Sequence, residues 1–288
     1  MFTRALPGNP NGDPDNDNMP RMDDDTQKGL VTDVAIKRKI RNYVGMTREN
    51  EMPNRIYMRE KAILNRAHAE TYASKRIKHV PEKPAPEKDA PSITSWMCQQ
   101  FYDIRAFGAV MNTEVHAGQV RGPVHFNFSE SVEPIQPDEI AITRSSVTNE
   151  QDAVKERTMA RKLVVPYGLY HCHGYVSANL SGRTGFSQID LDLLLEALPN
   201  MLEHDRMAAR AEMNARKLIV FKHGSKFGNA PAQKLQRLIE IGRRIDGDFA
   251  SLNGRPDSSL PPARRFDDYE IRIDRAGIPV DVELIEIL

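Results

Sequence analysis

The chain has 288 residues, of which 40% are hydrophobic and 28% charged, and its 40 basic and 40 acidic side chains balance to a net charge of zero. This length and apolar content suffice for one large domain or two smaller ones. The zero net charge argues against a generally basic protein that coats DNA without specificity. It does not exclude a nucleic-acid partner, because seven aspartates fall within residues 13–33 whereas basic residues cluster elsewhere.

Cysteine content and hydropathy bear on the cellular location. The two cysteines, Cys98 and Cys172, lie far apart in the sequence, which is typical of a reducing intracellular compartment. No run approaches the roughly 18 apolar residues that a membrane-spanning helix needs, and the first residues show no signal-peptide pattern. We therefore expect a cytoplasmic, soluble protein without a membrane partner.

A polar loop is expected near the start of the chain. Phe2–Leu6 is a candidate short strand, and Pro7–Asp25 follows as a stretch rich in Pro, Gly, Asn and Asp. The dipeptides Asn11-Gly12 and Asp13-Pro14 are strong turn formers. We predict an ordered or partly mobile functional loop that is stabilised by side-chain-to-backbone turns.

Three alternating carboxylates in this loop, Asp13, Asp15 and Asp17, resemble the start of a calcium-binding loop. Two essential positions of that motif differ, because Asn18 stands where the sharp turn needs glycine and Asp24 replaces the bidentate glutamate. We therefore expect no metal at this loop.

A basic helix is predicted within Gly29–Val44, with Thr32 as its N-cap and Asp33 in its first turn. One apolar stripe recurs at helical spacing: Ile36, Ile40, Tyr43 and Val44. The remaining circumference carries four cations: Lys37, Arg38, Lys39 and Arg41. Such a helix presents positive charge to a polyanion, although an ordinary solvated helix face gives the same pattern.

The segment after this helix alternates polar helices with a linker. We expect a short strand at Arg55–Met58, a helix at Ala62–Lys78, a Pro-rich linker or insertion at Val80–Pro91, and a helix at Ile93–Met111. The aromatic residues of that last helix, Trp96 among them, are expected to be core rather than a platform for stacked bases.

A half-buried strand is predicted at Val124–Phe128, where apolar and polar residues alternate. Arg121-Gly122 before it, with Phe126 and Phe128 within it, weakly matches the motif by which RNA-recognition domains stack bases. Pro123 and Val124 replace the central residues of that motif, so it carries little weight alone.

A projecting hairpin is predicted from Glu139–Thr148 and Arg161–Val165, two strand-like arms that flank the polar connection Asn149–Thr158. The connection is too polar to be core. Four residues would place hydroxyl and cationic donors along the ribbon: Thr143, Arg144, Arg161 and Lys162. Such donors hold phosphates, although an ordinary amphipathic hairpin remains an equal alternative.

Tyr167–Leu180 is the most strand-like run of the chain, with His171 and His173 on one face and Cys172 on the other. A His-x-His pair can begin a zinc site, but no further ligand pair accompanies it. Polar contact with RNA, or a hydrogen-bonded sheet histidine, is the expected role.

The remaining chain mixes strands and helices irregularly, which indicates an α+β fold rather than a regular parallel sheet. The predicted helices are Ser187–Met201, His204–Asn214 and Pro231–Arg244. The predicted strands are Lys217–His223, Tyr269–Ile273 and Val280–Ile287, with a loop at Ser251–Arg265. The first of these strands ends in Lys222 and His223 beside a Gly-containing loop, so both are candidate RNA contacts.

Long motifs in a fixed order carry a resemblance that covers most of the chain: Gly8–Asp15 (GNPNGDPD), Asn18–Arg21 (NMPR), Gly29–Val44, Phe107–Pro123 (FGAVMNTEVHAGQVRGP), Ile142–Arg144 and Arg161–Gly174 (RKLVVPYGLYHCHG). On these motifs the chain resembles the backbone subunit of type I-C CRISPR Cascade complexes, in the RAMP superfamily. Members usually open with a longer hydrophobic strand than Met1–Leu6.

The resemblance implies a fold and a function. The expected fold is a single palm domain over residues 1–288 with a modified ferredoxin-like (RRM-type) core. Insertions at about 46–95 and 137–165 would form fingers and a thumb hairpin. Copies would polymerise head to tail along a CRISPR guide RNA, with other Cascade subunits, and present the guide for pairing with target DNA in antiviral defence.

The resemblance also assigns candidate RNA-binding residues. Six positions would belong to the palm groove: Asn9, Asn11, Lys37, Arg38, Arg41 and Arg121. The four hairpin donors named above would belong to the thumb, which reaches over the neighbour's guide segment and kinks it. Lys39 is expected to face a neighbouring copy or solvent.

Two other functions remain as alternatives. Related backbone subunits of other CRISPR types cut RNA with an acidic loop residue, so Asp13, Asp15 or Asp17 could act with Mg²⁺. The resemblance to a DNA-targeting type argues against this, and we expect no enzymatic activity and no cofactor. The second alternative is a single-stranded RNA-binding protein that works alone as a monomer.

Overall fold

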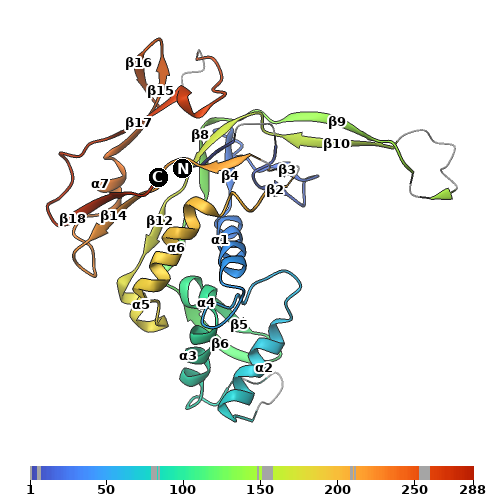
Figure 1. The fold of residues 1–288 in the computed structure, drawn as a ribbon, viewed down its shortest axis with the longest axis vertical. Coiled ribbons are helices and arrows are strands. Elements are labelled where there is room, and N and C mark those ends of the chain that lie inside the picture. Colours follow the sequence, from blue (N-terminus) through green and yellow to red (C-terminus); the bar gives the residue numbers. More distant parts are fainter. Residues whose placement is uncertain are drawn as a thin grey trace.

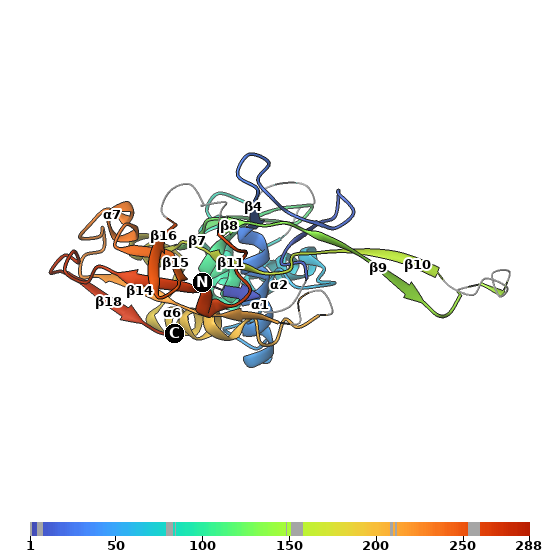
Figure 2. The same cartoon turned by 90° about the horizontal axis from the view of Figure 1, so that it is seen from above.

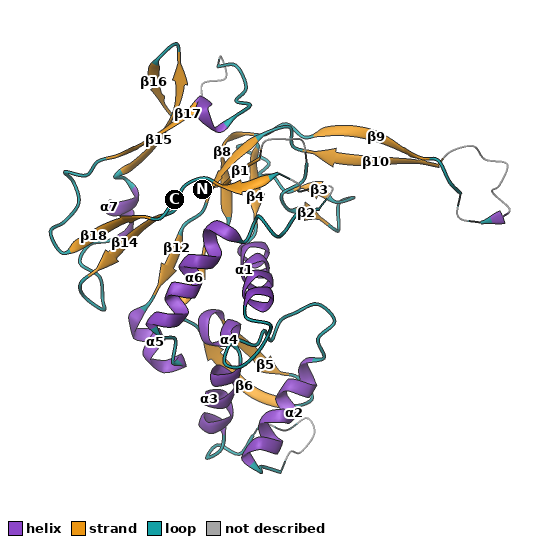
Figure 3. Cartoon of the chain, viewed as in Figure 1, coloured by secondary structure: helices purple, strands orange, loops and turns teal. Residues whose placement is uncertain are grey.

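The computed structural model describes residues 2–4, 8–78, 83, 85–147, 149–150, 158–207, 210, 212–252 and 260–288. The chain is a mixed α+β protein, as predicted (Figures 1 and 3). Its helices are α1 (Asp33–Thr47), α2 (Leu64–Lys75), α3 (Ala90–Gln100), α4 (Tyr102–Phe107), α5 (Ala178–Thr184), α6 (Gln188–Asn200), α7 (Ala232–Gln236) and the short 3-10 helix η2 (Phe266–Asp268). Among the described residues, no helix has the length and apolar character to cross a bilayer.

A five-stranded antiparallel sheet forms the centre of the molecule, with strand order β13-β1-β11-β8-β4. Its strands are β1 (Phe2–Arg4), β4 (Lys28–Val31), β8 (Ser129–Pro134), β11 (Gly168–His171) and β13 (Met213–Ala215). The predicted short first strand is confirmed at β1, and residues 5–7 lie outside the described part. Although β1 has three residues, it pairs on both sides, so it joins β13 to the other strands of the sheet.

Helices α1 and α6 pack on one face of this sheet and on each other. The Thr32 hydroxyl accepts a hydrogen bond from the backbone N–H of Ala35 and caps α1, as predicted. The predicted apolar stripe of α1 is buried, since Ile40 and Val44 have 0% exposure and Ile36 has 2%. α6 begins with a capping box in which Ser187 and Asp190 satisfy each other's backbone N–H groups.

The opposite face of the sheet is covered by a second, three-stranded sheet, ordered β16-β15-β17. Its strands are β15 (Ile239–Ile245), β16 (Asp248–Ser251) and β17 (Tyr269–Ile273). Leu169 of β11 packs toward this sheet, whereas the next residue, Tyr170, belongs to the core beneath the helices. Arg243 of β15 forms a buried ion pair with Glu133 of β8 at 2.8 Å. The helices therefore pack on one face of the central sheet, and the second sheet packs on the other face at β8 and β11.

A separate hydrophobic cluster organises the segment between α1 and β8, which occupies the lower part of Figure 3. It contains α2, α3, α4 and the hairpin of β5 (Gly108–Asn112) and β6 (His116–Arg121). The single helix predicted at Ile93–Met111 is instead two helices followed by the start of a strand. Phe101 has an extended backbone that separates α3 from α4, and Gly108, with φ of 77°, ends α4 and starts a strand. The strand predicted at Arg55–Met58 is limited to a bridge between Arg55 and Phe101.

The predicted projecting hairpin is confirmed by β9 (Asp138–Arg144) and β10 (Thr158–Val164). Figures 1 and 2 show the ribbon extending away from the body in both views. Of the predicted connection, residues 151–157 lie outside the described part. Backbone hydrogen bonds in both directions between Gly8 and Val165 tie the base of the hairpin to the N-terminal loop, which contains β2 (Gly12–Asp13) and β3 (Met19–Pro20).

The remaining strands are short pairs: β7 (Val124–Phe126) with β12 (Gly174–Val176), and β14 (Ile219–His223) with β18 (Val282–Glu286). The helix predicted at His204–Asn214 is wrong for its described residues, which form turns and the start of β13. The helix predicted at Pro231–Arg244 covers only α7, because the alternating residues after it pair as β15. Parts of the predicted segments Val80–Pro91 and Ser251–Arg265 lie outside the described residues.

Candidate nucleic-acid interface

The N-terminal loop is fastened to the start of α1 by Asn11. Its side-chain oxygen accepts hydrogen bonds from the Thr32 backbone N–H at 2.9 Å and from the Thr32 hydroxyl at 3.0 Å. Asn9 is 3% exposed and donates its amide to the Asn18 carbonyl, whereas its side-chain oxygen has no partner within the described residues. A buried acceptor without a partner is costly, so Asn9 presents an oxygen that a ligand hydroxyl or amino group can satisfy.

The four cations of α1 have different surroundings. Lys37 pairs with Asp33 at 2.7 Å, and Arg41 Nε donates to Asp103 at 2.8 Å. Arg38 is exposed and has no ion pair with another described residue. Lys37 and Arg41 are partly buried, so their positive charge is reduced by a carboxylate neighbour. The helix therefore offers less free charge than its sequence predicts.

The structure corrects the prediction made for Lys39. This side chain is not directed to solvent or a neighbouring copy: it is 4% exposed and forms an ion pair with Asp205. Burial lowers the pKa of Lys39, although its hydrogen bond to Asp205 opposes this effect. The charge of Lys39 therefore joins α1 to the turn after α6.

Phe107 lies beneath two of the predicted palm cations. The Lys37 ammonium is 5.9 Å from the centre of its ring and the Arg41 guanidinium is 5.2 Å from it. Arg121 is exposed at the end of β6 and pairs with Gly108, the next residue after Phe107. The structure thus brings together Lys37, Arg41 and Arg121, which are far apart in sequence. We call these three residues with Asn9, Asn11 and Arg38 the palm strip.

The four hairpin donors divide between two faces of the ribbon. Directly opposed residues share a face, and the register pairs Lys162 with Ile140 and Arg144 with Thr158. Arg144 and Lys162 therefore share the face that carries Ile140 and Ile142. Thr143 and Arg161 lie on the other face, where Arg161 pairs with Glu139 at 3.0 Å. Arg144, Thr143 and Arg161 are exposed, so both faces present polar donors.

His171 and His173 lie where β11 ends, with their rings edge to face at 5.5 Å. Burial, followed by the neighbouring His173 charge, lowers the pKa of His171 to about 4. Burial also lowers the pKa of His173. Both rings are therefore neutral near pH 7 and can offer hydrogen bonds, not positive charge. No group of three or more His, Cys, Asp or Glu side chains suited to a metal occurs in the described part of the chain.

Lys222 and His223 are not brought to the palm strip. They lie in β14, which Figure 1 places on the opposite side of the molecule from the hairpin. Lys222 pairs with Glu283 at 3.1 Å, and His223 Nδ1 accepts a hydrogen bond from the Asn229 backbone at 2.9 Å. Both residues therefore have local partners within the described part of the chain, and their RNA contact stays a prediction.

Sequence reasoning missed two contributors to the palm strip. Phe107 was expected only as core, and Asp103, which is 1% exposed, accepts hydrogen bonds from Arg41 and from two backbone N–H groups, of Tyr57 and Met58. No sequence signal marks Asp103, since its partners are 45 to 62 positions away. The residues of the weak RNA-recognition motif do not belong to the central sheet. Phe126 lies in β7 and packs near Phe107, and Phe128 is 52% exposed.

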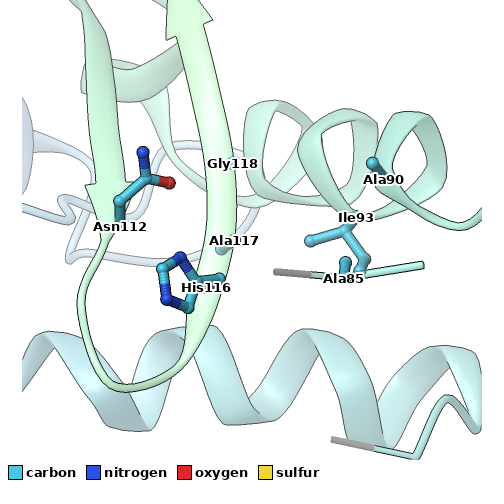
Figure 4. A pocket seen from close by; sticks show the side chains of 7 residues that line it. All are labelled: Ala85, Ala90, Ile93, Asn112, His116, Ala117 and Gly118. Carbon is cyan, nitrogen blue, oxygen red and sulfur yellow. The ribbon is translucent and has the colours of Figure 1, made fainter. Parts of the chain in front are cut away.

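A small cavity near the tip of the β5–β6 hairpin is unsuited to a nucleotide (Figure 4). Its volume is about 90 Å³, and His116 and Asn112 of the hairpin face Ile93 and Ala90 of α3 across it. The remaining lining residues are small: Ala85, Ala117 and Gly118. This cavity is a packing gap within the hydrophobic cluster.

Comparison with known proteins identifies the family. A family model described as CRISPR-associated protein Cas7 matches residues 1–274. The chain is 24% identical over 251 residues to a "CRISPR-associated protein Cas7" of Haloferax volcanii, which covers 81% of this chain and 72% of that protein. The chain itself has an α+β fold from which the β9–β10 hairpin extends as a ribbon. The chain belongs to the Cas7 family of CRISPR-associated proteins.

One solved structure shows the same fold. A chain of a "CRISPR RNA-guided surveillance complex, pre-nicking" superposes with a TM-score of 0.50 at 14% identity, covering 81% of this chain and 80% of that one. A chain of another "CRISPR RNA-guided surveillance complex" gives a TM-score of 0.47 at 13% identity, covering 82% and 72%.

Proposed function

We propose that this chain is the guide-binding backbone subunit of a type I-C Cascade surveillance complex. Copies polymerise head to tail along the CRISPR guide RNA, together with other Cascade subunits, and present the guide for pairing with target DNA. The projecting hairpin carries this proposal. It is fastened to the N-terminal loop at Gly8 and Val165, so it joins the predicted thumb donors to the predicted palm residues.

The order of the central sheet supports a ferredoxin-like core for this palm. Following the chain through β1, α1, β8, β11, α6 and β13 gives a βαββαβ succession, and these four strands lie in the order β13-β1-β11-β8. Both helices pack on the same face. We assign the segment of about 46–95, with α2 and part of α3, to fingers inserted in this core, and that of about 137–165 to the thumb.

The chemistry of the palm strip suits a guide that is held by its backbone. Cations and amide groups contact phosphates and sugars without reading sequence, which leaves bases free to pair. The central sheet cannot stack bases on its second face, because the β15–β17 sheet covers β8 and β11 there. We infer that recognition proceeds along the edge formed by the N-terminal loop, the start of α1 and the base of the hairpin.

Assembly on a guide separates this proposal from a stand-alone RNA-binding protein. Light scattering after size exclusion would measure the mass of the complexes formed by purified chain with a repeat-flanked guide and with an unrelated RNA. We expect defined multi-copy complexes on the guide. Single-copy complexes on both RNAs would favour the stand-alone protein.

We also propose that the chain acts without catalysis, in the cytoplasm. Asp13 pairs with Arg21 at 3.0 Å, so one of the three carboxylates considered for a metal is held by a cation. Guide RNA incubated with the protein and Mg²⁺ should remain intact on a denaturing gel. Specific cleavage that disappears in Asp15→Asn or Asp17→Asn would instead establish a ribonuclease.

A further inference from the structure

A polar pocket lies outside the palm strip, between the loop that follows α1 and the first turns of α2. Its volume is about 300 Å³, and residues 50–70 line it together with Phe101. Four cations face it: Arg55, Arg59, Lys61 and Arg66. Glu70 is the single acidic side chain among the lining residues, all of which the structure describes. The pocket is therefore strongly electropositive.

Three of these cations lack a compensating carboxylate. Glu70 is engaged by Arg55 through two hydrogen bonds of 2.8 and 3.3 Å, and the Arg55 guanidinium also lies 4.7 Å from the centre of the Phe101 ring. Arg59, Lys61 and Arg66 are exposed and form no ion pair with any described residue. This contrasts with Lys37 and Arg41 of α1, which have carboxylate partners.

The loop that carries these cations is held in place from below. The Asn50 side chain accepts a hydrogen bond from the Ile56 backbone at 2.7 Å, and Asp103 accepts from the Tyr57 and Met58 backbones at 2.8 and 3.0 Å. Lys61 adopts the left-handed backbone conformation, with φ of 59°. These hydrogen bonds fix the backbone from which Arg59 and Lys61 project, so less backbone conformational entropy is lost when a ligand binds.

We propose that this pocket binds the phosphodiester backbone of a nucleic-acid strand other than the guide segment held by the palm strip. Arginine and lysine without acidic partners are suited to phosphate. The two aromatic residues of the pocket, Tyr57 and Phe101, are only 4% and 2% exposed, so bases cannot stack on them and binding is independent of sequence. That the strand differs from the guide rests on the proposed function.

The arrangement separates the two sites. Asp103 lies between them, because it binds Arg41 of the palm strip on one side and the backbone of the pocket loop on the other. Figure 1 shows α2 at the far end of α1 from the hairpin. The pocket cations and the hairpin donors therefore lie on different parts of the molecule.

A charge-matched pair of variants tests the proposal. Fluorescence anisotropy would measure binding of a labelled single-stranded DNA, unrelated to the guide, to the full chain with and without bound guide RNA. In Arg59→Ala/Lys61→Ala/Arg66→Ala, we expect DNA affinity to fall at least about tenfold and the slope of log affinity against log salt to decrease by about 2, since three phosphate contacts are lost. Guide affinity and Tm should not change.

The control variant Arg183→Ala/Lys234→Ala/Arg237→Ala removes an equal number of positive charges, three, from exposed positions of α5 and the α7 region. An equal loss of DNA affinity in both variants would overturn the proposal. Failure of the wild-type chain to bind guide would count against the proposed function alone, because DNA binding is measured separately.

Crosslinking locates the strand in the unaltered protein. A photoreactive DNA should crosslink to peptides within residues 50–70, and crosslinks confined to other peptides would contradict the site. A further outcome would also overturn it: pocket variants that keep DNA affinity but lose multi-copy assembly. The pocket would then accept the acidic loop of a neighbouring copy, residues 13–25.

Discussion

Arg38 and Lys39 are consecutive cations of α1 with opposite surroundings. Lys39 is buried against Asp205, and Arg38 is exposed. We expect Lys39→Met to lower the free energy of unfolding by about 3 kcal/mol, because it leaves a largely buried carboxylate without its main partner. Urea unfolding measures this change. The double variant Lys39→Met/Asp205→Leu removes the unpaired carboxylate and should recover part of the loss; recovery should be incomplete because Arg210, which pairs with Asp205 at 3.3 Å, loses that partner.

For Arg38 we expect a change in RNA affinity without a change in stability. Arg38→Ala removes a free cation from the palm strip, so affinity should fall severalfold and by similar factors for different RNA sequences. Filter binding with the guide and a scrambled RNA measures both. The triple variant Lys37→Ala/Arg38→Ala/Arg41→Ala should lose more, and unchanged affinity in the triple variant would place the RNA on another surface.

Asn11 should matter first for stability. Its side-chain oxygen accepts two hydrogen bonds from Thr32, so Asn11→Ala is expected to lower the free energy of unfolding by about 1–2 kcal/mol. Chemical denaturation measures the loss. Asn42→Ala, at an exposed position of α1, serves as control and should leave stability unaltered. Equal effects of the two substitutions would refute the anchoring role of Asn11.

One buried and two half-buried histidines predict acid sensitivity. Burial lowers the pKa of His68, His171 and His173 below 6.5 in the folded chain, with His171 at about 4. The unfolded chain therefore binds protons first as pH falls, and stability should decrease between about pH 6.5 and 4. Above this window the histidines contribute no pH dependence. Denaturation at several pH values should show a shallower decrease for His171→Gln than for wild type; parallel curves would contradict the assignment.

At the scale of elements, the two faces of the β9–β10 ribbon make distinct predictions. We expect Arg144→Ala/Lys162→Ala to weaken guide binding and to lower the salt slope by about 1, because two phosphate contacts are lost. Thr143→Ala/Arg161→Ala tests the other face, where Arg161 already pairs with Glu139. Tm should stay constant in both, since the ribbon lies outside the cores. Equal, negligible effects on binding would exclude the ribbon from the interface.

Sequence patterns predicted the elements whose signals are local. The stripe and cap of α1 and the arms of the hairpin were predicted within a few residues, because periodicity and capping depend on near neighbours. The helix over Ile93–Met111 failed because tertiary pairing holds Phe101 extended and Gly108 begins a strand. The residues after His204 failed similarly, since β13 gains its partner from β1 at the other end of the chain.

The candidate site was predictable in its residue types and not in its charge balance. Asn11, Lys37, Arg41 and Arg121 were chosen by resemblance, and the structure brings them along one edge. The partners Asp103 and Asp205 lie 62 and 166 positions from the cations that they neutralise, and no local pattern encodes such pairs. The pocket over residues 50–70 was overlooked for the related reason that its cations are scattered across a loop and a helix.

At the scale of the whole molecule, a neutral chain separates its charges by position. The helices pack on one face of the central sheet and the β15–β17 sheet packs on the other over β8 and β11. Under the proposed function we therefore assign the guide to the edge with the N-terminal loop and hairpin. The electropositive pocket is lined by the loop that follows α1 and by α2, away from the hairpin. The proposed function, polymerisation along a guide, would require such distinct surfaces for guide, neighbour and second strand.

The nucleic acid that co-purifies with the protein tests the central claim most directly. Sequencing RNA recovered from the chain expressed beside its own CRISPR array should give a discrete guide with repeat-derived flanks, bound by several copies. A heterogeneous mixture of cellular RNA bound by single copies would contradict the account.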